Sequence, residues 1–119
     1  MPLKELFASF RDKYMRSSVD KLEFPHFPPD EEKRYRILFS GMVQGVGFRY
    51  EAWLIAERLE LTGFAKNLAN GDVLVEVQGP KNRIFHLTKC MESIRRIIIE
   101  NKEMTEIPLK EEKEFMPIY

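Results

Sequence analysis

The chain has 119 residues, enough for one compact domain and too few for two ordinary ones. Its 19 basic and 19 acidic side chains cancel, so the positive surface that nucleic-acid binding needs is missing, and no polybasic segment favours a membrane surface. The single cysteine cannot form an internal disulfide, and two histidines are few for a metal site, so we expect no metal and no cofactor. No signal-peptide pattern begins the chain, which predicts a cytoplasmic protein with a small-molecule partner.

Residues 1–34 are predicted to form an N-terminal extension before a domain over 35–119. Five apolar residues recur at helical spacing and predict a short amphipathic helix: Leu3, Leu6, Phe7, Phe10 and Tyr14. The proline-rich segment 24–29 and the charged run 30–34 then predict a stiff connector that is neither helix nor strand. Because so short a helix is marginal alone, we expect its apolar stripe to pack on its own domain or on a second subunit.

After the extension, the pattern alternates between strands and helices. Residues 35–40 predict a strand, and 49–60 predict a helix. The apolar side of this helix consists of Ala52, Trp53, Ile55, Ala56 and Leu59. Strands are predicted near 64–69 and 72–78, joined by the hairpin turn that Asn70-Gly71 strongly indicates.

The rest of the domain adds a second helix and its last strands. A helix is predicted near 81–100, with a buried stripe formed by Ile84, Leu87, Met91, Ile94 and Ile98. A strand near 104–111 and a short last strand over 115–119 follow. The order βαββαβ predicts the α+β ferredoxin-like split βαβ sandwich, with an antiparallel sheet and two helices on one face. The apolar stripe of the extension could cover part of the other face or an edge.

Side chains beside the second helix's stripe have unremarkable predicted roles. His86 falls outside the stripe and is expected on the surface, whereas Cys90 lies next to it and is expected to pack in or near the core. The basic pair Arg95-Arg96 and the segment 81–83 are expected to be solvated helix charges. None of these residues is a candidate for catalysis.

The loop between the first strand and the first helix is the main candidate site. It contains three glycines, Gly41, Gly45 and Gly47, which allow backbone conformations that other residues avoid. A strand-to-helix turn directs free N–H groups toward the helix start, where the dipole favours an anion. Arg49 follows directly, and its planar guanidinium can pair with two phosphate oxygens. On these features alone, a glycine-rich turn with a solvated arginine remains an equal alternative.

Two strings in the chain resemble the signatures of the acylphosphatase family. These are GMVQGVGFR over residues 41–49 and GFAKNLANGDV over 63–73, and the resemblance extends over about 35–119. It implies a ferredoxin-like hydrolase that converts acyl phosphates to carboxylate and phosphate without a metal, with phosphate as product and inhibitor. The extension has no counterpart in the minimal family domain, so a monomer and a weak dimer through the extension both remain open.

The resemblance also assigns roles to individual residues. It implies a phosphate cradle formed by Gln44, Gly45, Val46, Gly47 and Phe48. Arg49 would bind the phosphoryl group, and Asn67 would orient the attacking water. An asparagine near a hairpin often only satisfies turn backbone, but Asn70 is the better turn residue and leaves Asn67 available.

Three alternatives come from other functional classes. One is a non-catalytic domain that binds carbamoyl phosphate, like the acylphosphatase-like segment of hydrogenase maturation factors, although no downstream domain follows here. Another is an RNA-binding module, which would want exposed aromatic residues on its central strands and a basic surface. A small-ligand regulatory domain would not need Arg49 at the helix start. The enzyme remains the leading hypothesis.

Overall fold

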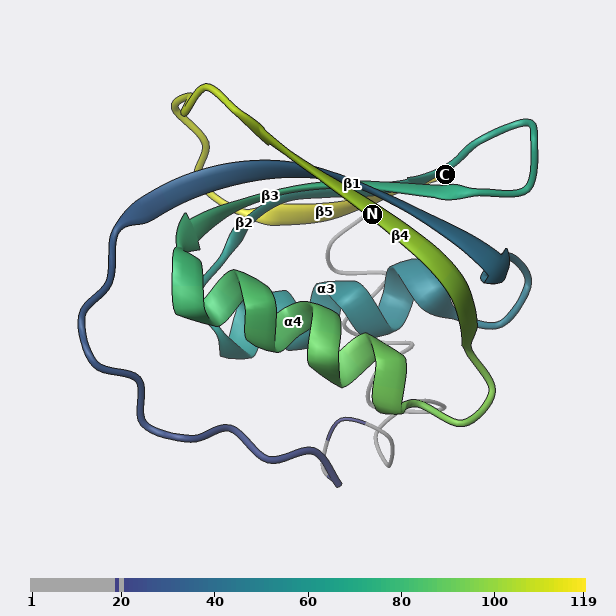
Figure 1. The fold of residues 1–119 in the computed structure, drawn as a ribbon, viewed down its shortest axis with the longest axis horizontal. Helices are drawn as coiled ribbons and strands as arrows, with labels where there is room; N and C mark the ends of the chain where they lie inside the picture. Colours follow the sequence, from purple (N-terminus) through teal and green to yellow (C-terminus); the bar gives the residue numbers. More distant parts are fainter. Residues whose placement is uncertain (1–18, 20) are drawn as a thin grey trace, which may run out of the picture.

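A five-stranded sheet with two helices on one face forms the body of the chain (Figure 1). The structure is a computed structural model that describes residues 19 and 21–119. The amphipathic helix predicted within the first 18 residues lies outside this described part. In chain order the elements are β1 (Glu32–Met42), α3 (Phe48–Arg58), β2 (Thr62–Asn67), β3 (Val73–Pro80), α4 (Lys81–Ser93), β4 (Ile98–Ile107) and β5 (Phe115–Ile118).

The strands lie in the order β4-β1-β3-β2-β5. All neighbours are antiparallel except β2 and β5, which are parallel. This arrangement confirms the predicted ferredoxin-like fold, and β5 confirms the short last strand. The parallel pairing brings Ile118 beside Lys66, near the last residue of β2.

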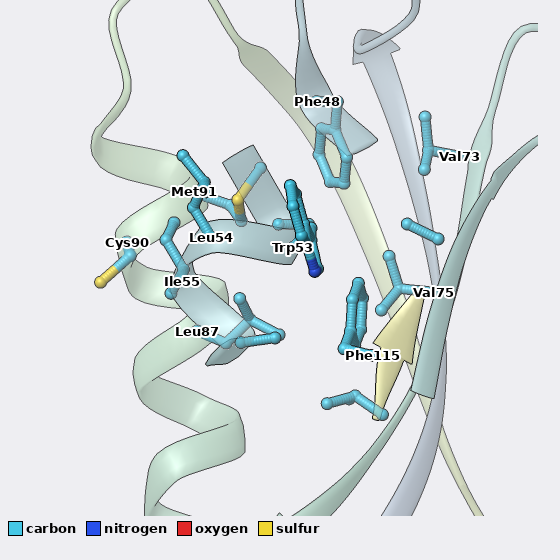
Figure 2. Close-up of a cluster of buried hydrophobic side chains, with 14 of the residues drawn as sticks. Phe48, Trp53, Leu54, Ile55, Val73, Val75, Leu87, Cys90, Met91 and Phe115 are labelled. Carbon is cyan, nitrogen blue, oxygen red and sulfur yellow. The ribbon is translucent and has the colours of Figure 1, made fainter. Parts of the chain in front are cut away.

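The core lies between the sheet and the two helices. Alternate residues of the central strands point toward the helices, because successive side chains of a strand lie on opposite faces. Figure 2 shows Val73 and Val75 facing Phe48 and Trp53 of α3, with Phe115 of β5 beside Val75. The predicted apolar side of α3 is entirely buried, as is Cys90 of α4.

Helix α4 is shorter than the sequence pattern predicts. It ends at Ser93, and Ile94 already has an extended backbone, with ψ of 119°. Ile98, expected in the buried helical stripe, instead pairs with Met42 in the sheet and is 48% exposed. Its predicted place in the helix is therefore wrong. The run Ile97–Ile99 explains the difference, because β-branched side chains favour a strand when a partner strand is available.

Strand β1 begins earlier than predicted, within the charged run. Arg34 was expected in the connector, yet it lies in β1 and is only 1% exposed. It is on the face without helices, where its guanidinium donates to Glu112 at 2.7 Å and to Glu76 at 3.1 Å. A charged side chain can be buried when it is paired with an opposite charge. The charged run 30–34 is therefore compatible with a strand and does not by itself indicate a loop. The division into an extension and a domain over 35–119 remains a prediction.

The segment between β4 and β5 crosses this helix-free face. Strand β4 ends at Ile107, short of the predicted 111, and the chain then turns over the sheet. The carboxamide of Gln78 is hydrogen-bonded to both the N–H and the carbonyl of Lys110, at 3.0 and 2.8 Å. Together with the Arg34–Glu112 pair, these bonds fix the path that leads into β5.

The described part of the connector follows the helical layer instead. His86 Nε2 lies 2.7 Å from the carbonyl oxygen of Glu23, and its ring meets Phe24 and Phe27 edge to face. In Figure 1 this segment passes beneath the helices before entering β1. His86 therefore lies on the surface of α4, outside the buried stripe as predicted, and it also contacts the connector.

Candidate active site

The loop between β1 and α3 has the backbone conformation that its glycines suggest. Gly45 and Gly47 have φ angles of 73° and 80°, in the left-handed region that side chains disfavour. A Cβ at Gly45 would meet no heavy atom of the described residues within 4 Å. Glycine is needed there for the backbone conformation and leaves open space beside the loop.

Helix α3 starts at this loop with its N–H groups available. Gly47 is the N-cap residue, and no side chain in the described part of the chain caps this helix end. The first N–H groups of a helix have no partner within the helix. Their dipoles add up to partial positive charge, so this helix start favours an anion such as phosphate.

A side chain of the loop ties it to the hairpin between β2 and β3. Gln44 Nε2 donates to the carbonyl oxygens of Leu68 and Asp72, at 2.7 and 2.8 Å. The hairpin itself is closed by Asn70, whose Oδ1 accepts from the N–H of Asp72 at 3.0 Å. Asn70 is thus the turn residue, as predicted, and Gln44 fixes the loop relative to the strand that carries Asn67.

A second tie comes from the turn after α4. Arg96 Nε donates to the carbonyl oxygen of Val46 at 2.8 Å, and its Nη2 donates to Glu51 Oε1 at 2.7 Å. Glu51 lies in the first turn of α3 and is fully buried. Arg96 was expected to be a solvated helix charge. It is 39% exposed, but its predicted place in the helix is wrong, because it lies beyond the end of α4 and contacts the loop.

Arg49 is held by the end of β5. Its Nη1 donates to the carbonyl oxygen of Ile118 at 2.9 Å, and its Cζ lies 3.8 Å from the centre of the Tyr119 ring. Tyr119 has a raised pKa because burial disfavours its phenolate, although the charge of Arg49 opposes this. The phenol therefore stays neutral near pH 7 and stacks on the guanidinium without forming an ion pair through its side chain.

The predicted residues meet around one pocket of about 60 Å³, far smaller than the cavities that hold drug-sized ligands. It is lined by Val43, Gly45, Gly47, Phe48, Arg49, Asn67 and Tyr119. Of the predicted cradle, Gln44 and Val46 do not line it and instead carry the two ties. Asn67 is the last residue of β2, and its Oδ1 is buried without a hydrogen-bond partner among the described residues.

Sequence reasoning did not find Tyr119 or Arg96. Both act on the loop from distant parts of the chain, and neither lies in a recognisable motif. Within the described residues, no group of three or more histidine, cysteine, aspartate or glutamate side chains is arranged to hold a metal ion. None of the described helices is long and apolar enough to cross a membrane.

These features describe a small pocket at a helix start on a ferredoxin-like α+β domain. The sequence profile of the family described as Acylphosphatase matches residues 35–117. An acylphosphatase of Clostridium perfringens strain SM101 is 45% identical over 76 residues, which cover 60% of this chain and 85% of that protein. The chain belongs to the acylphosphatase family, a family of hydrolases.

Two further comparisons support this assignment. An acylphosphatase of Clostridium beijerinckii is 55% identical over 52 residues, a match that spans 44% of this chain and 58% of that protein. The solved structure of an acylphosphatase from Coxiella burnetii superposes with a TM-score of 0.68 at 34% identity, covering 73% of this chain and 93% of that one.

Proposed function

We propose that this protein hydrolyses acyl phosphates to a carboxylate and inorganic phosphate without a metal ion. The observation that carries the proposal is the small pocket that is lined by Arg49, Asn67 and the first residues of α3. A cation, free N–H groups and a carboxamide are the groups that this reaction needs.

The phosphoryl group binds first. Its oxygens accept hydrogen bonds from the N–H groups of the loop and of the first turn of α3, and Arg49 pairs with two of them. These donors are fixed before the substrate arrives, so little reorganisation is needed as charge develops on the phosphoryl oxygens. Because Ile118 and Tyr119 hold Arg49, its guanidinium enters the reaction already positioned.

Asn67 then orients the attacking water. Its buried Oδ1 can accept a hydrogen bond from this water, which would satisfy an acceptor that is otherwise unpaired. The water oxygen bonds to phosphorus while the bond from phosphorus to the acyl oxygen breaks. One proton of the water passes to a phosphoryl oxygen, so no separate base is needed.

The leaving group explains why so simple a site suffices. The acyl oxygen departs with the bonding electron pair as a carboxylate, whose conjugate acid has a pKa near ~4. It therefore needs no proton from a general acid, whereas the alkoxide released from an alkyl phosphate would. Positioning and charge stabilisation are what remains for the protein to supply.

We further propose that the protein works in the cytoplasm on a small-molecule acyl phosphate, as a monomer or weak dimer. A neutral balance of charges and one buried cysteine support this setting. Burial raises the pKa of the Cys90 thiol to about 11, with a small opposing effect of Lys89, so this thiol is poorly reactive at neutral pH.

The test is the release of phosphate from an aromatic acyl phosphate in excess chelator, beside an alkyl phosphate. We expect full activity on the acyl phosphate, competitive inhibition by inorganic phosphate and little activity on the alkyl ester. Activity that is lost in chelator and restored by a divalent ion would contradict the metal-free mechanism. Phosphate binding without turnover would instead indicate a binding domain.

A further inference from the structure

Arg96 is a half-exposed side chain that contacts the loop between β1 and α3 and pairs with the fully buried Glu51, and neither residue lines the pocket. We propose that Arg96 is a positioning residue that sets the loop for phosphate, by fixing one peptide group and by neutralising one buried carboxylate. This inference rests on the proposed function of the same site. Arg96 does not line the pocket, so it would act through Val46 and Glu51 and not by touching the substrate.

The first part of the argument concerns the peptide group between Val46 and Gly47. In a trans peptide the C=O and N–H point in opposite directions. Arg96 Nε holds the Val46 carbonyl at 2.8 Å, so the N–H of Gly47 must point the other way. Gly47 lines the pocket and Val46 does not. The N–H of Gly47 therefore points toward the pocket, where the anion would bind.

This peptide group needs an external restraint. One of its two flanking residues, Gly47, has a left-handed backbone, and glycine is the residue with the greatest freedom to leave such a conformation. A rotated Val46–Gly47 peptide would direct a carbonyl oxygen toward the phosphate and repel it. The hydrogen bond from Arg96 opposes this rotation.

The second part concerns charge. Glu51 is fully buried in the first turn of the helix whose start receives the anion. A carboxylate at this position interacts favourably with the helix dipole, but it also repels a nearby phosphate. Arg96 Nη2 donates to it at 2.7 Å and compensates the charge, so the field at the helix start remains favourable for an anion.

The experiment compares three variants of the full chain. Arg96→Lys keeps a cation that can hold only one of the two acceptors at a time. Arg96→Met with Glu51→Gln removes the tie to Val46 without leaving an unbalanced buried carboxylate. Arg95→Met is the matched control, because Arg95 is the exposed neighbour of Arg96. Circular dichroism and melting curves establish that each variant is folded.

Two readouts are measured: the dissociation constant of inorganic phosphate by calorimetry, and kcat and KM with an acyl phosphate. For both Arg96 variants we expect the dissociation constant of phosphate and the KM to rise about tenfold, with a smaller change in kcat. A tenfold rise is equivalent to the loss of one hydrogen bond to a charged group. Arg95→Met should match the wild type. A purely structural role would lower the melting temperature without this split between KM and kcat.

The outcomes separate this inference from the proposed function. If folded Arg96 variants bind phosphate as tightly as the wild type, the inference is overturned while hydrolysis by the wild type stands. If the wild type binds phosphate but does not hydrolyse acyl phosphates, the proposed function fails, and the calorimetric constants still decide the role of Arg96. A wild type that does not bind phosphate overturns both.

Discussion

Arg49 and Asn67 line the same pocket, but their polar groups differ in the contacts that they make. Arg49 is fixed by a hydrogen bond to Ile118 and by the ring of Tyr119. Asn67 presents a buried carboxamide oxygen that has no partner among the described residues. In the proposed mechanism, Arg49 is thus preorganised to bind charge, and Asn67 has an acceptor available to orient the water.

The stacking of Tyr119 on Arg49 gives a prediction for this anchor. Tyr119→Leu removes the aromatic face, so Arg49 should become more mobile, and KM and the phosphate inhibition constant should rise about two- to fivefold. This matches about 0.5–1 kcal/mol for an exposed cation–π contact. Steady-state kinetics check it, with Tyr119→Phe as the control that keeps the ring. Equal constants for all three proteins would contradict a role for the stack.

The sequence motifs predicted Arg49 and Asn67 as site residues but could not show which contacts hold Arg49. Each lies in a sequence string that resembles a family signature, so its position could be inferred from its neighbours in the sequence. The anchor of Arg49 depends on β5 pairing in parallel with β2, a contact between residues distant in sequence. Periodicity and turn signals report only neighbours along the chain, so they could not predict it.

Among the elements, the helix-free face of the sheet carries an ionic cluster that guides the chain into β5. Arg34 of β1 joins Glu76 of β3 to Glu112 of the crossing segment, and Arg36 adds a bond to Glu76 at 3.1 Å. Burial raises the pKa of Glu76, but the hydrogen bonds from both arginines outweigh it, so the net pKa lies below its usual value near 4.5. The cluster therefore stabilises the charged form.

This shift predicts how stability depends on pH. A carboxyl whose pKa is lower when folded contributes stability above its unfolded pKa and loses it as pH falls through the folded value. Glu76→Gln should lower the free energy of unfolding by about 1–3 kcal/mol at pH 7. The deficit should persist down to about pH 5 and shrink below about pH 4.5.

Urea unfolding of both proteins across this pH range measures the effect. Glu111→Gln is the matched control, since Glu111 is an exposed residue beside Glu112 on the same crossing segment. A deficit that stays constant down to pH 3 would show that Glu76 contributes by packing and not by its charge.

The end of α4 shows where the sequence pattern fits both a helix and a strand. Ile94 and Ile98 fit the helical spacing of Ile84, Leu87 and Met91, so the sequence favours one long helix. The same isoleucines also suit a strand, and pairing of Ile98 and Ile99 with β1 decides between the two. Tertiary contacts therefore set the boundary, which is why the turn that places Arg96 in contact with the loop was missed.

At the scale of the whole molecule, the connector and the site lie at opposite ends of α3. The connector contacts α4 near its start, where Asn82 Nδ2 donates to the carbonyl of Pro28 at 2.9 Å and His86 meets Glu23. The pocket lies at the N-terminal end of α3, whereas Arg58 at the other end is near the Phe24 ring. Docking of the connector should therefore affect stability more than catalysis.

His86→Ala tests this separation. It removes the ring between two phenylalanines and one hydrogen bond, so the free energy of unfolding should fall by about 1–2 kcal/mol. Turnover should remain within about twofold, because no pocket residue contacts this ring. Chemical unfolding and steady-state kinetics provide the two measurements, with Lys89→Ala on the exposed side of α4 as the control. A large loss of turnover at unchanged stability would show that the connector is coupled to the site.

The overall architecture was predictable because its signals are local and agree with one another. Alternating valines predict β3, Asn70-Gly71 predicts its hairpin, and the apolar side of α3 predicts a helix over a sheet. The path of the connector was not predictable, since a proline-rich segment carries no periodicity that would choose between the two faces of the sheet. Its position follows from contacts with His86 and Asn82, which are distant in sequence and lie on α4.

The most direct test of the proposed mechanism measures kcat and the phosphate inhibition constant for Asn67→Ala and Arg49→Lys beside the wild type. Asn67→Ala leaves the loop intact, so phosphate should bind nearly normally while kcat falls a hundredfold or more, about 3 kcal/mol. Arg49→Lys loses the planar guanidinium, so phosphate inhibition should weaken, KM should rise and kcat should fall together. If both folded variants match the wild type, the site lies elsewhere and the proposed mechanism is wrong.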